Sequence, residues 1–224
     1  MNDAGSAAPV GAVAAQAAAR VAATIRDEIR ATSSYATAKP SGMIELHANE
    51  NPWPLPAALR AELAAAVAET AVNRYPEGAG DRVREALARA LPLPEGAAVV
   101  LGNGSDELIQ IVTSAIARPG ATVLAPDPTF VMYRIYAMLA GVRYVPVPLR
   151  ADFTLDAEAL AAAIARERPA LVWLATPNNP TGRALPLASI ERILALAPGL
   201  VVVDVDVHGT VDGYEALERA RREG

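Results

Sequence analysis

From residue 97 onward, the sequence alternates short apolar runs with segments of helical periodicity. This alternation predicts right-handed βαβ units, and therefore an α/β fold with three layers: a mostly parallel sheet with helices on both faces. We expect strands at 97–101, 121–125, 142–147, 170–175 and 199–205, and helices at 105–118, 130–140, 156–167 and 187–196. In such sheets ligands bind outside the carboxyl ends of the strands, and polar motifs follow several of these runs.

The N-terminal part has a different pattern. Val21, Ile25 and Ile29 lie four residues apart in an Ala-rich stretch, which predicts one helical arm over 9–31. A linker rich in Ser, Thr and Pro follows, and helices are expected at 56–70 and 81–91. We divide the chain into an N-terminal helix and linker (1–42), an incomplete α/β domain (43–206) and a divergent tail (207–224).

Composition excludes several classes of function. The net charge of −5 offers no basic surplus for binding nucleic acid, and the chain has no cysteine for disulfides or thiolate metal sites. Only two histidines occur, His47 and His208, so a histidine-based metal cluster is not expected. No apolar run is long enough to span a bilayer, and no basic residue precedes the Ala-rich start, so we expect neither a membrane protein nor a secreted one, but a cytoplasmic one.

Four motifs carry candidate chemistry, and the first is a glycine-rich turn before a helix, Leu101-Gly-Asn-Gly-Ser-Asp-Glu107. The backbone N–H groups at Ser105, Asp106 and Glu107 would face outward at a helix N-terminus, where an anion such as phosphate is favoured. An ordinary capped turn, with Ser105 or Asp106 as the N-cap, explains the motif equally well.

The next two motifs place an aromatic and an amide after strands. Pro126-Asp-Pro-Thr-Phe130 would project Phe130 over the sheet edge, where it could stack on a planar ligand or instead belong to the core. Ala175-Thr-Pro-Asn-Asn-Pro-Thr-Gly182 contains two adjacent Asn, and Pro180 would hold Asn179 rigidly against a ligand oxygen. For the segment 175–182, an ordinary turn is the alternative.

The fourth motif is Asp204, an acid at the end of the apolar run Val201-Val-Val. A carboxylate in that position is costly without a partner, which could be a ligand cation or a protonated ring nitrogen. The alternative is a residue that only caps the next element.

Together these motifs resemble those of the fold-type I pyridoxal-phosphate-dependent aminotransferases, and within them the histidinol-phosphate aminotransferase subfamily. The resemblance rests on five segments: His47-Ala-Asn-Glu-Asn-Pro52, NRYP (73–76), GNGSDELI (102–109), PTFVMY (128–133) and ATPNNPTG (175–182). It implies transamination of a donor such as L-histidinol phosphate with a 2-oxo acid such as 2-oxoglutarate. It also implies a homodimer.

The resemblance implies a role for each matching residue. Ser105, Asp106 and Glu107 would bind the cofactor phosphate. Phe130 would stack on the pyridine ring, Asn179 would hydrogen-bond the ring hydroxyl, and Asp204 would pair with the ring nitrogen. Tyr75 would reach the phosphate of the neighbouring subunit, and Tyr35 and Asn51 resemble substrate-contacting positions, although a linker residue and a turn residue explain these two as well.

The sequence departs from the family after Asp204. Relatives carry a Schiff-base lysine beyond that acid, whereas the single lysine here is Lys39, in the N-terminal linker. We therefore assign no catalytic residue, and interpret the chain as a truncated or reading-frame-altered aminotransferase, inactive alone and with weak or no cofactor binding. One alternative is a non-catalytic module that binds the cofactor or dimerises. Another is a phosphatase-like loop at Asp204-Val-Asp206.

Overall fold

The structure is a computed structural model, and it describes residues 10–32, 42, 53–75, 80–91, 93 and 96–205. Four strands form one sheet in the order β2-β1-β3-β4, and every neighbouring pair is parallel. The strands are β1 (Thr122–Asp127), β2 (Arg143–Pro148), β3 (Leu171–Ala175) and β4 (Leu200–Asp204). The helices that accompany them are α5 (Gly104–Ala115), α6 (Met132–Leu139), α7 (Ala157–Glu167) and α8 (Leu187–Leu196).

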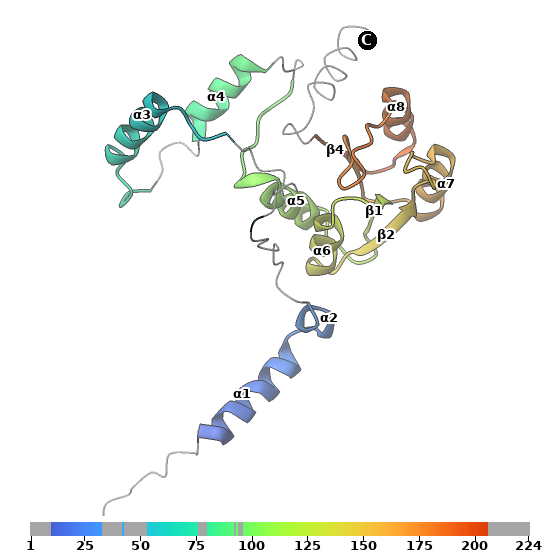
Figure 1. Cartoon of the computed structure of the whole chain (residues 1–224). Helices are drawn as coiled ribbons and strands as arrows, with labels where there is room; N and C mark the ends of the chain where they lie inside the picture. Colours follow the sequence, from blue (N-terminus) through green and yellow to red (C-terminus); the bar gives the residue numbers. More distant parts are fainter. Residues whose placement is uncertain are drawn as a thin grey trace, which may run out of the picture.

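Helices lie on both faces of the sheet (Figure 1), and one apolar cluster lies on each face, which confirms the predicted three layers. On one face, α5 and α6 pack Ile109 and Tyr133 against Val123 and Trp173. On the other face, α7 and α8 pack against alternate residues of the same strands; this cluster contains Leu124, Leu160, Ala163, Ile164, Val172, Leu174, Ile190 and Ile193. β1 and β3 are buried over nearly their whole length because both faces are covered, as the continuous apolar runs predicted.

The strand expected at 97–101 does not form: these residues carry no strand pairing, and Val100 is 69% exposed. The apolar run alone cannot produce a strand, because a strand requires a neighbour for its backbone hydrogen bonds. The edges of the described sheet are β2 and β4. The glycine turn at 102–104 therefore follows a segment without regular secondary structure and not a sheet strand.

The single helix expected at 9–31 is also wrong. It is divided into α1 (Val10–Thr24) and α2 (Asp27–Arg30), because the backbone at Arg26 is extended, with ψ of 144°. The break lets the Arg26 guanidinium donate to the carbonyl oxygens of Met138 and Leu139, at 3.0 and 2.7 Å. These carbonyls end α6, where a cation is favoured.

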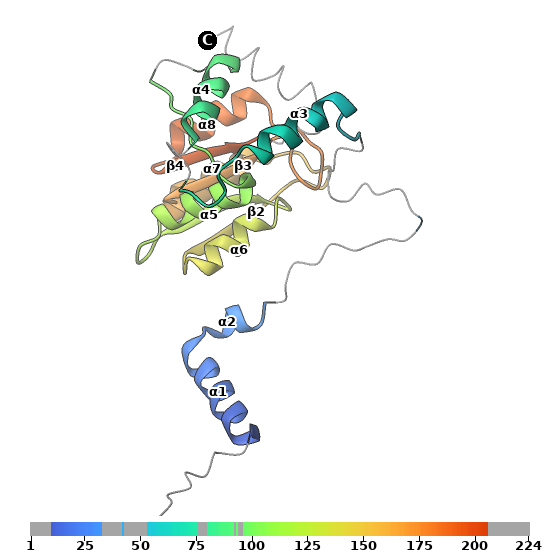
Figure 2. The same cartoon turned by 90° about the vertical axis from the view of Figure 1, so that its left-hand side faces the viewer.

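Two further helices, α3 (Ala57–Ala68) and α4 (Asp81–Ala90), stand apart from the sheet and its helices in Figure 1, and α1 projects away from the sheet in both views (Figures 1 and 2). On α3, Leu59, Leu63 and Val67 lie four residues apart, and each is about half exposed. Among the described residues, no helix combines the length and the apolar character that crossing a bilayer requires. The tail 207–224 lies outside the described residues.

Candidate functional site

The centre of the candidate site is a hydrogen bond between α6 and the end of β4. The hydroxyl of Tyr133 donates to Oδ2 of Asp204 over 2.5 Å. Tyr133 is fully buried and Asp204 is partly buried. The partner that Asp204 was expected to need is thus supplied in part by the chain itself, and among the described residues this bond engages Oδ2 and not Oδ1.

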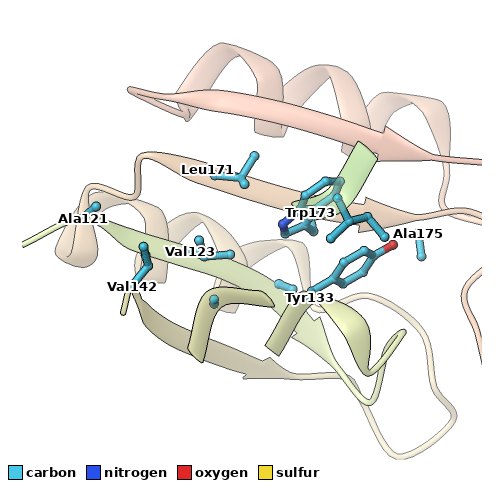
Figure 3. Packing of buried hydrophobic residues seen from close by; sticks show 10 residues of the cluster. Ala121, Val123, Tyr133, Val142, Leu171, Trp173 and Ala175 are labelled. Atoms are coloured by element: carbon cyan, nitrogen blue, oxygen red, sulfur yellow. The ribbon is translucent and has the colours of Figure 1, made fainter. Parts of the chain in front are cut away.

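Three aromatic rings position that hydroxyl. The Tyr133 ring stacks on Trp173 of β3, with 4.8 Å between centroids and an interplanar angle of 3°, and Phe130 meets Tyr133 edge-on at 5.7 Å. Figure 3 shows the two stacked rings, with the hydroxyl directed toward Ala175 at the carboxyl end of β3. Burial, and then the neighbouring Asp204 carboxylate, raise the pKa of Tyr133 far above its ordinary value, so the phenol stays protonated and remains a donor.

Phe130 was expected either to stack on a ligand or to belong to the core, and the structure bears on the second alternative. It is partly buried and packs against the α5–α6 cluster, as a core residue does. It also lies directly after β1, at the carboxyl edge of the sheet, and contacts the tyrosine that holds Asp204. Stacking of Phe130 on a ligand stays a prediction.

The amide loop after β3 uses its two asparagines differently. Asn178 is 5% exposed, and its side chain bonds Pro128, Thr129 and Thr181. Asn179, the residue expected to contact a ligand, is exposed. The first asparagine thus anchors the loop, and the second lies on its surface, where a ligand can reach it.

The glycine turn leads into α5 as expected, but its capping differs from both proposed N-caps. Asn103 is the N-cap, and Ser105, Asp106 and Glu107 all lie exposed in the first turn. The Glu107 carboxylate accepts the Asn103 N–H. The remaining first-turn N–H groups have no partner within the helix, which is the donor set that a phosphate requires, although two carboxylates stand in the same turn.

Among the described residues, Tyr75 is the predicted site residue that lies outside this cluster: it follows α3 and is 97% exposed. Tyr35 and Asn51, together with Lys39, His47 and His208, lie outside the described residues.

Sequence reasoning missed Tyr133 and Asn178. Tyr133 follows Phe130 by three residues, the spacing that brings two side chains to one helix face, and this spacing was the available signal. For Asn178 the signal was the doublet itself, because one residue of a pair in a tight loop commonly bonds the backbone.

The sequence of this chain is similar to those of known aminotransferases. A model of the class I and II aminotransferases matches residues 41–218. A histidinol-phosphate aminotransferase of Chromobacterium violaceum is 54% identical over 180 residues, which are 80% of this chain and 51% of the relative. One of Thiocapsa roseopersicina is 49% identical, over 80% of this chain and 96% of that relative. The chain spans about half the length of most of the curated relatives it matches.

The fold of this chain is also similar to the solved structures of aminotransferases. The histidinol-phosphate aminotransferase of Sinorhizobium meliloti, determined with pyridoxal-5'-phosphate, is 29% identical with a TM-score of 0.56, over 67% of this chain and 40% of that one. YbdL of Escherichia coli, a protein with methionine aminotransferase function, is 26% identical with a TM-score of 0.58, over 69% and 43%.

The parallel sheet with helices on both faces is the fold-type I architecture of pyridoxal-phosphate-dependent aminotransferases, to which this chain is similar. The chain belongs to the class I and II aminotransferase family. The family match and the complex of the Sinorhizobium structure support pyridoxal phosphate as the cofactor. The residues present fit it: an acceptor for a ring N–H, an aromatic beside it, an exposed amide and a helix N-terminus.

Proposed function

We propose that this chain forms the cofactor-binding part of a histidinol-phosphate aminotransferase, which transfers the amino group between L-histidinol phosphate and 2-oxoglutarate. The observation that carries the proposal is the Tyr133–Asp204 hydrogen bond. It fixes a carboxylate at the carboxyl edge of a parallel sheet, where such folds bind their ligands.

Asp204 would receive the protonated ring nitrogen of pyridoxal phosphate. An opposite charge beside that nitrogen favours its protonated form. When bound, the cofactor supplies an electron sink for the substrate electrons that are released as the α-proton leaves. The part of this chain is to hold the acceptor in place, because Tyr133 orients one carboxylate oxygen and a buried aromatic stack prevents the tyrosine from turning away.

The remaining contacts are proposed from the motif match. Phe130 stacks on the ring and Asn179 bonds the ring hydroxyl, while the first turn of α5, at Ser105, Asp106 and Glu107, binds the phosphate. Their positions at strand ends and at a helix N-terminus support these assignments.

The substrate and assembly contacts are proposed in the same way. Tyr75 reaches the phosphate of a second subunit in a homodimer, and its 97% exposure leaves it free for that contact. Tyr35 and Asn51 contact the substrate. We further propose a cytoplasmic location, which the family's biosynthetic role supports.

The chain alone is proposed to be inactive. Its single lysine, Lys39, matches no family position for the residue that binds the cofactor covalently and moves the substrate proton. The names of the relatives favour an origin in this enzyme over the alternative of a non-catalytic module.

Equilibrium dialysis against pyridoxal phosphate tests the proposal, with Asp204→Asn as the comparison and 2-oxoglutarate-dependent transamination as a parallel assay. Of the two expectations, weak binding or none, the proposal requires the first: we expect weak but saturable binding that the substitution weakens further, and no transamination. Binding that is equal in both proteins would contradict the role of Asp204, and turnover by the chain alone would contradict its proposed inactivity.

A further inference from the structure

Asn178 joins two loops that are about 50 residues apart in sequence. One loop follows β1 and the other follows β3, and these two strands are neighbours in the sheet. Its Nδ2 donates to the carbonyl of Pro128 at 3.0 Å and to the hydroxyl of Thr181 at 2.9 Å. Its Oδ1 accepts the hydroxyl proton of Thr129 at 2.7 Å. Both amide hydrogens and one side of the carbonyl oxygen are therefore used.

The backbone of the same residue closes its own loop. The N–H of Asn178 donates to the carbonyl of Arg183 at 2.8 Å, and the N–H of Gly182 donates to the carbonyl of Asn178 at 2.7 Å. With 5% of its surface exposed, the residue has little access to water, so losing one of these partners leaves a buried polar group unpaired.

The two loops carry the two residues proposed to contact the cofactor ring beside Asp204. Phe130 immediately follows Thr129, and Asn179 immediately follows Asn178. We propose that Asn178 is a positioning residue that couples these loops, so that the aromatic and the exposed amide keep one spacing across the ring site. This inference rests on the proposed function for the identity of the ligand, but the coupling itself is a property of the chain.

A purely structural asparagine is the competing explanation. It would lower the stability of the fold when removed, but a change in one loop would not alter the other loop within the native state. The two explanations differ in whether a substitution at Thr129 affects the loop of Gly182, and in whether that effect requires Asn178.

The test is amide hydrogen exchange at the N–H of Gly182 in the full chain. Thr129→Val is nearly isosteric and removes only the hydroxyl that bonds Asn178. We expect it to speed exchange at Gly182, in the opposite loop, by about two- to tenfold, the effect of one weakened hydrogen bond. In the Asn178→Ala background the same substitution should have no further effect, because the link is already gone.

Thr154→Val is the matched control, since it removes a threonine hydroxyl that bonds Asp152, in another loop. It should leave exchange at Gly182 unchanged. The coupling is overturned if Thr129→Val does not change exchange at Gly182, or if it acts equally with and without Asn178. Should Asn178→Ala fail to fold, Asn178→Leu takes its place in the cycle, since it removes the bonds to Thr129 and Pro128 and fills the same space with an apolar side chain.

Pyridoxal phosphate affinity provides the second readout, measured by equilibrium dialysis. Thr129→Val and Thr181→Val should each weaken binding by about two- to tenfold and act non-additively, because both act through the same amide. Unchanged affinities, or strictly additive losses, would overturn the positioning role. A wild-type chain that binds no pyridoxal phosphate would instead contradict the proposed function, while the exchange cycle would still decide the coupling.

Discussion

The Tyr133 hydroxyl and the Asp204 carboxylate, 71 residues apart, are joined by a 2.5 Å hydrogen bond between α6 and the last residue of β4. The bond links the α5–α6 face of the core to an edge strand of the sheet. Tyr133 therefore both packs in this face of the core and orients Asp204, the candidate acceptor for the ring nitrogen.

Tyr133→Phe should lower the free energy of unfolding by about 1.5–3 kcal/mol at most, the usual range for a hydrogen bond to a charged group, reduced by the partial exposure of Asp204. The aromatic stack on Trp173 is retained, so the loss is confined to the hydroxyl. Urea unfolding measures the change, and pyridoxal phosphate affinity should decrease in the same variant.

Two variants separate the contributions. Tyr136→Phe, on the same helix, removes a phenol for which the structure gives no bond to Asp204, and it should cost less than about 0.5 kcal/mol. Asp204→Asn retains an acceptor for Tyr133 but not the charge, so it should affect cofactor binding more than stability. If Tyr133→Phe and Tyr136→Phe were equally stable, the bond would have no measurable energetic role.

Stability should fall at alkaline pH. Burial, and then the charge of Asp127, raise the pKa of Tyr144 from 10.0 to about 12, against a smaller opposing effect of Arg134. Between these values the unfolded chain loses a proton that the folded chain retains, so the contribution of Tyr144 is complete below pH 10 and is lost as pH rises toward 12. Tyr133 shifts in the same direction.

Melting temperatures across this pH range provide the measurement, with tyrosinate absorbance recorded in parallel. Tyr144→Phe should flatten the alkaline decline because it removes one of the linked groups. A decline of the same steepness in that variant would show that other groups cause the alkaline loss.

Gly102→Ala should destabilise the start of α5. A Cβ at this position would lie 2.8 Å from Cγ of Leu108, so the first turn must shift. We expect a cost of about 1–3 kcal/mol, typical of overpacking, together with weaker phosphate binding, and Leu108→Ala should restore part of the loss.

Gly104→Ala is the comparison, because the cost there has another cause. Gly104 has a φ of 76° and no heavy atom within 4 Å of an added Cβ, so Leu108→Ala should not rescue it. Rescue of both glycine variants, or of neither, would contradict the contact with Leu108.

The sheet domain should carry most of the cooperative stability. Leu174 is fully buried in β3, and Leu174→Ala should cost about 2–5 kcal/mol, as large-to-small core substitutions do. Leu63 on α3 is 53% exposed, and Leu63→Ala should cost less than about 1 kcal/mol. Urea unfolding of both variants measures the difference, and equal costs would mean that α3 is as well packed as the sheet.

The sequence predicted the regular part of the fold well, because alternation and continuous apolar runs encode burial on two faces. Strand β3 and helix α8 fall within a residue of their expected ranges. The failures at 97–101 and at Arg26 have a common physical reason: one depends on a partner strand, and the other on an α6 terminus more than 100 residues away. Neither of these long-range contacts can be predicted from the local sequence pattern.

For the site, the sequence predicted residue types better than their roles. The position of Asp204 at a strand end was predictable from the apolar run before it. Its tertiary partner Tyr133 was not, because the bond depends on how α6 packs on the sheet. Which of Asn178 and Asn179 anchors the loop and which stays exposed likewise depends on which side chain faces the loop at Pro128.

The nitrogen NMR signal of pyridoxal phosphate labelled with ¹⁵N in its ring tests most directly whether Asp204 receives the ring nitrogen. In complex with the wild-type chain at mildly alkaline pH, the account predicts the shift of a protonated nitrogen, and in Asp204→Asn the shift of an unprotonated one. A wild-type signal identical to that of the Asp204→Asn complex would contradict the account.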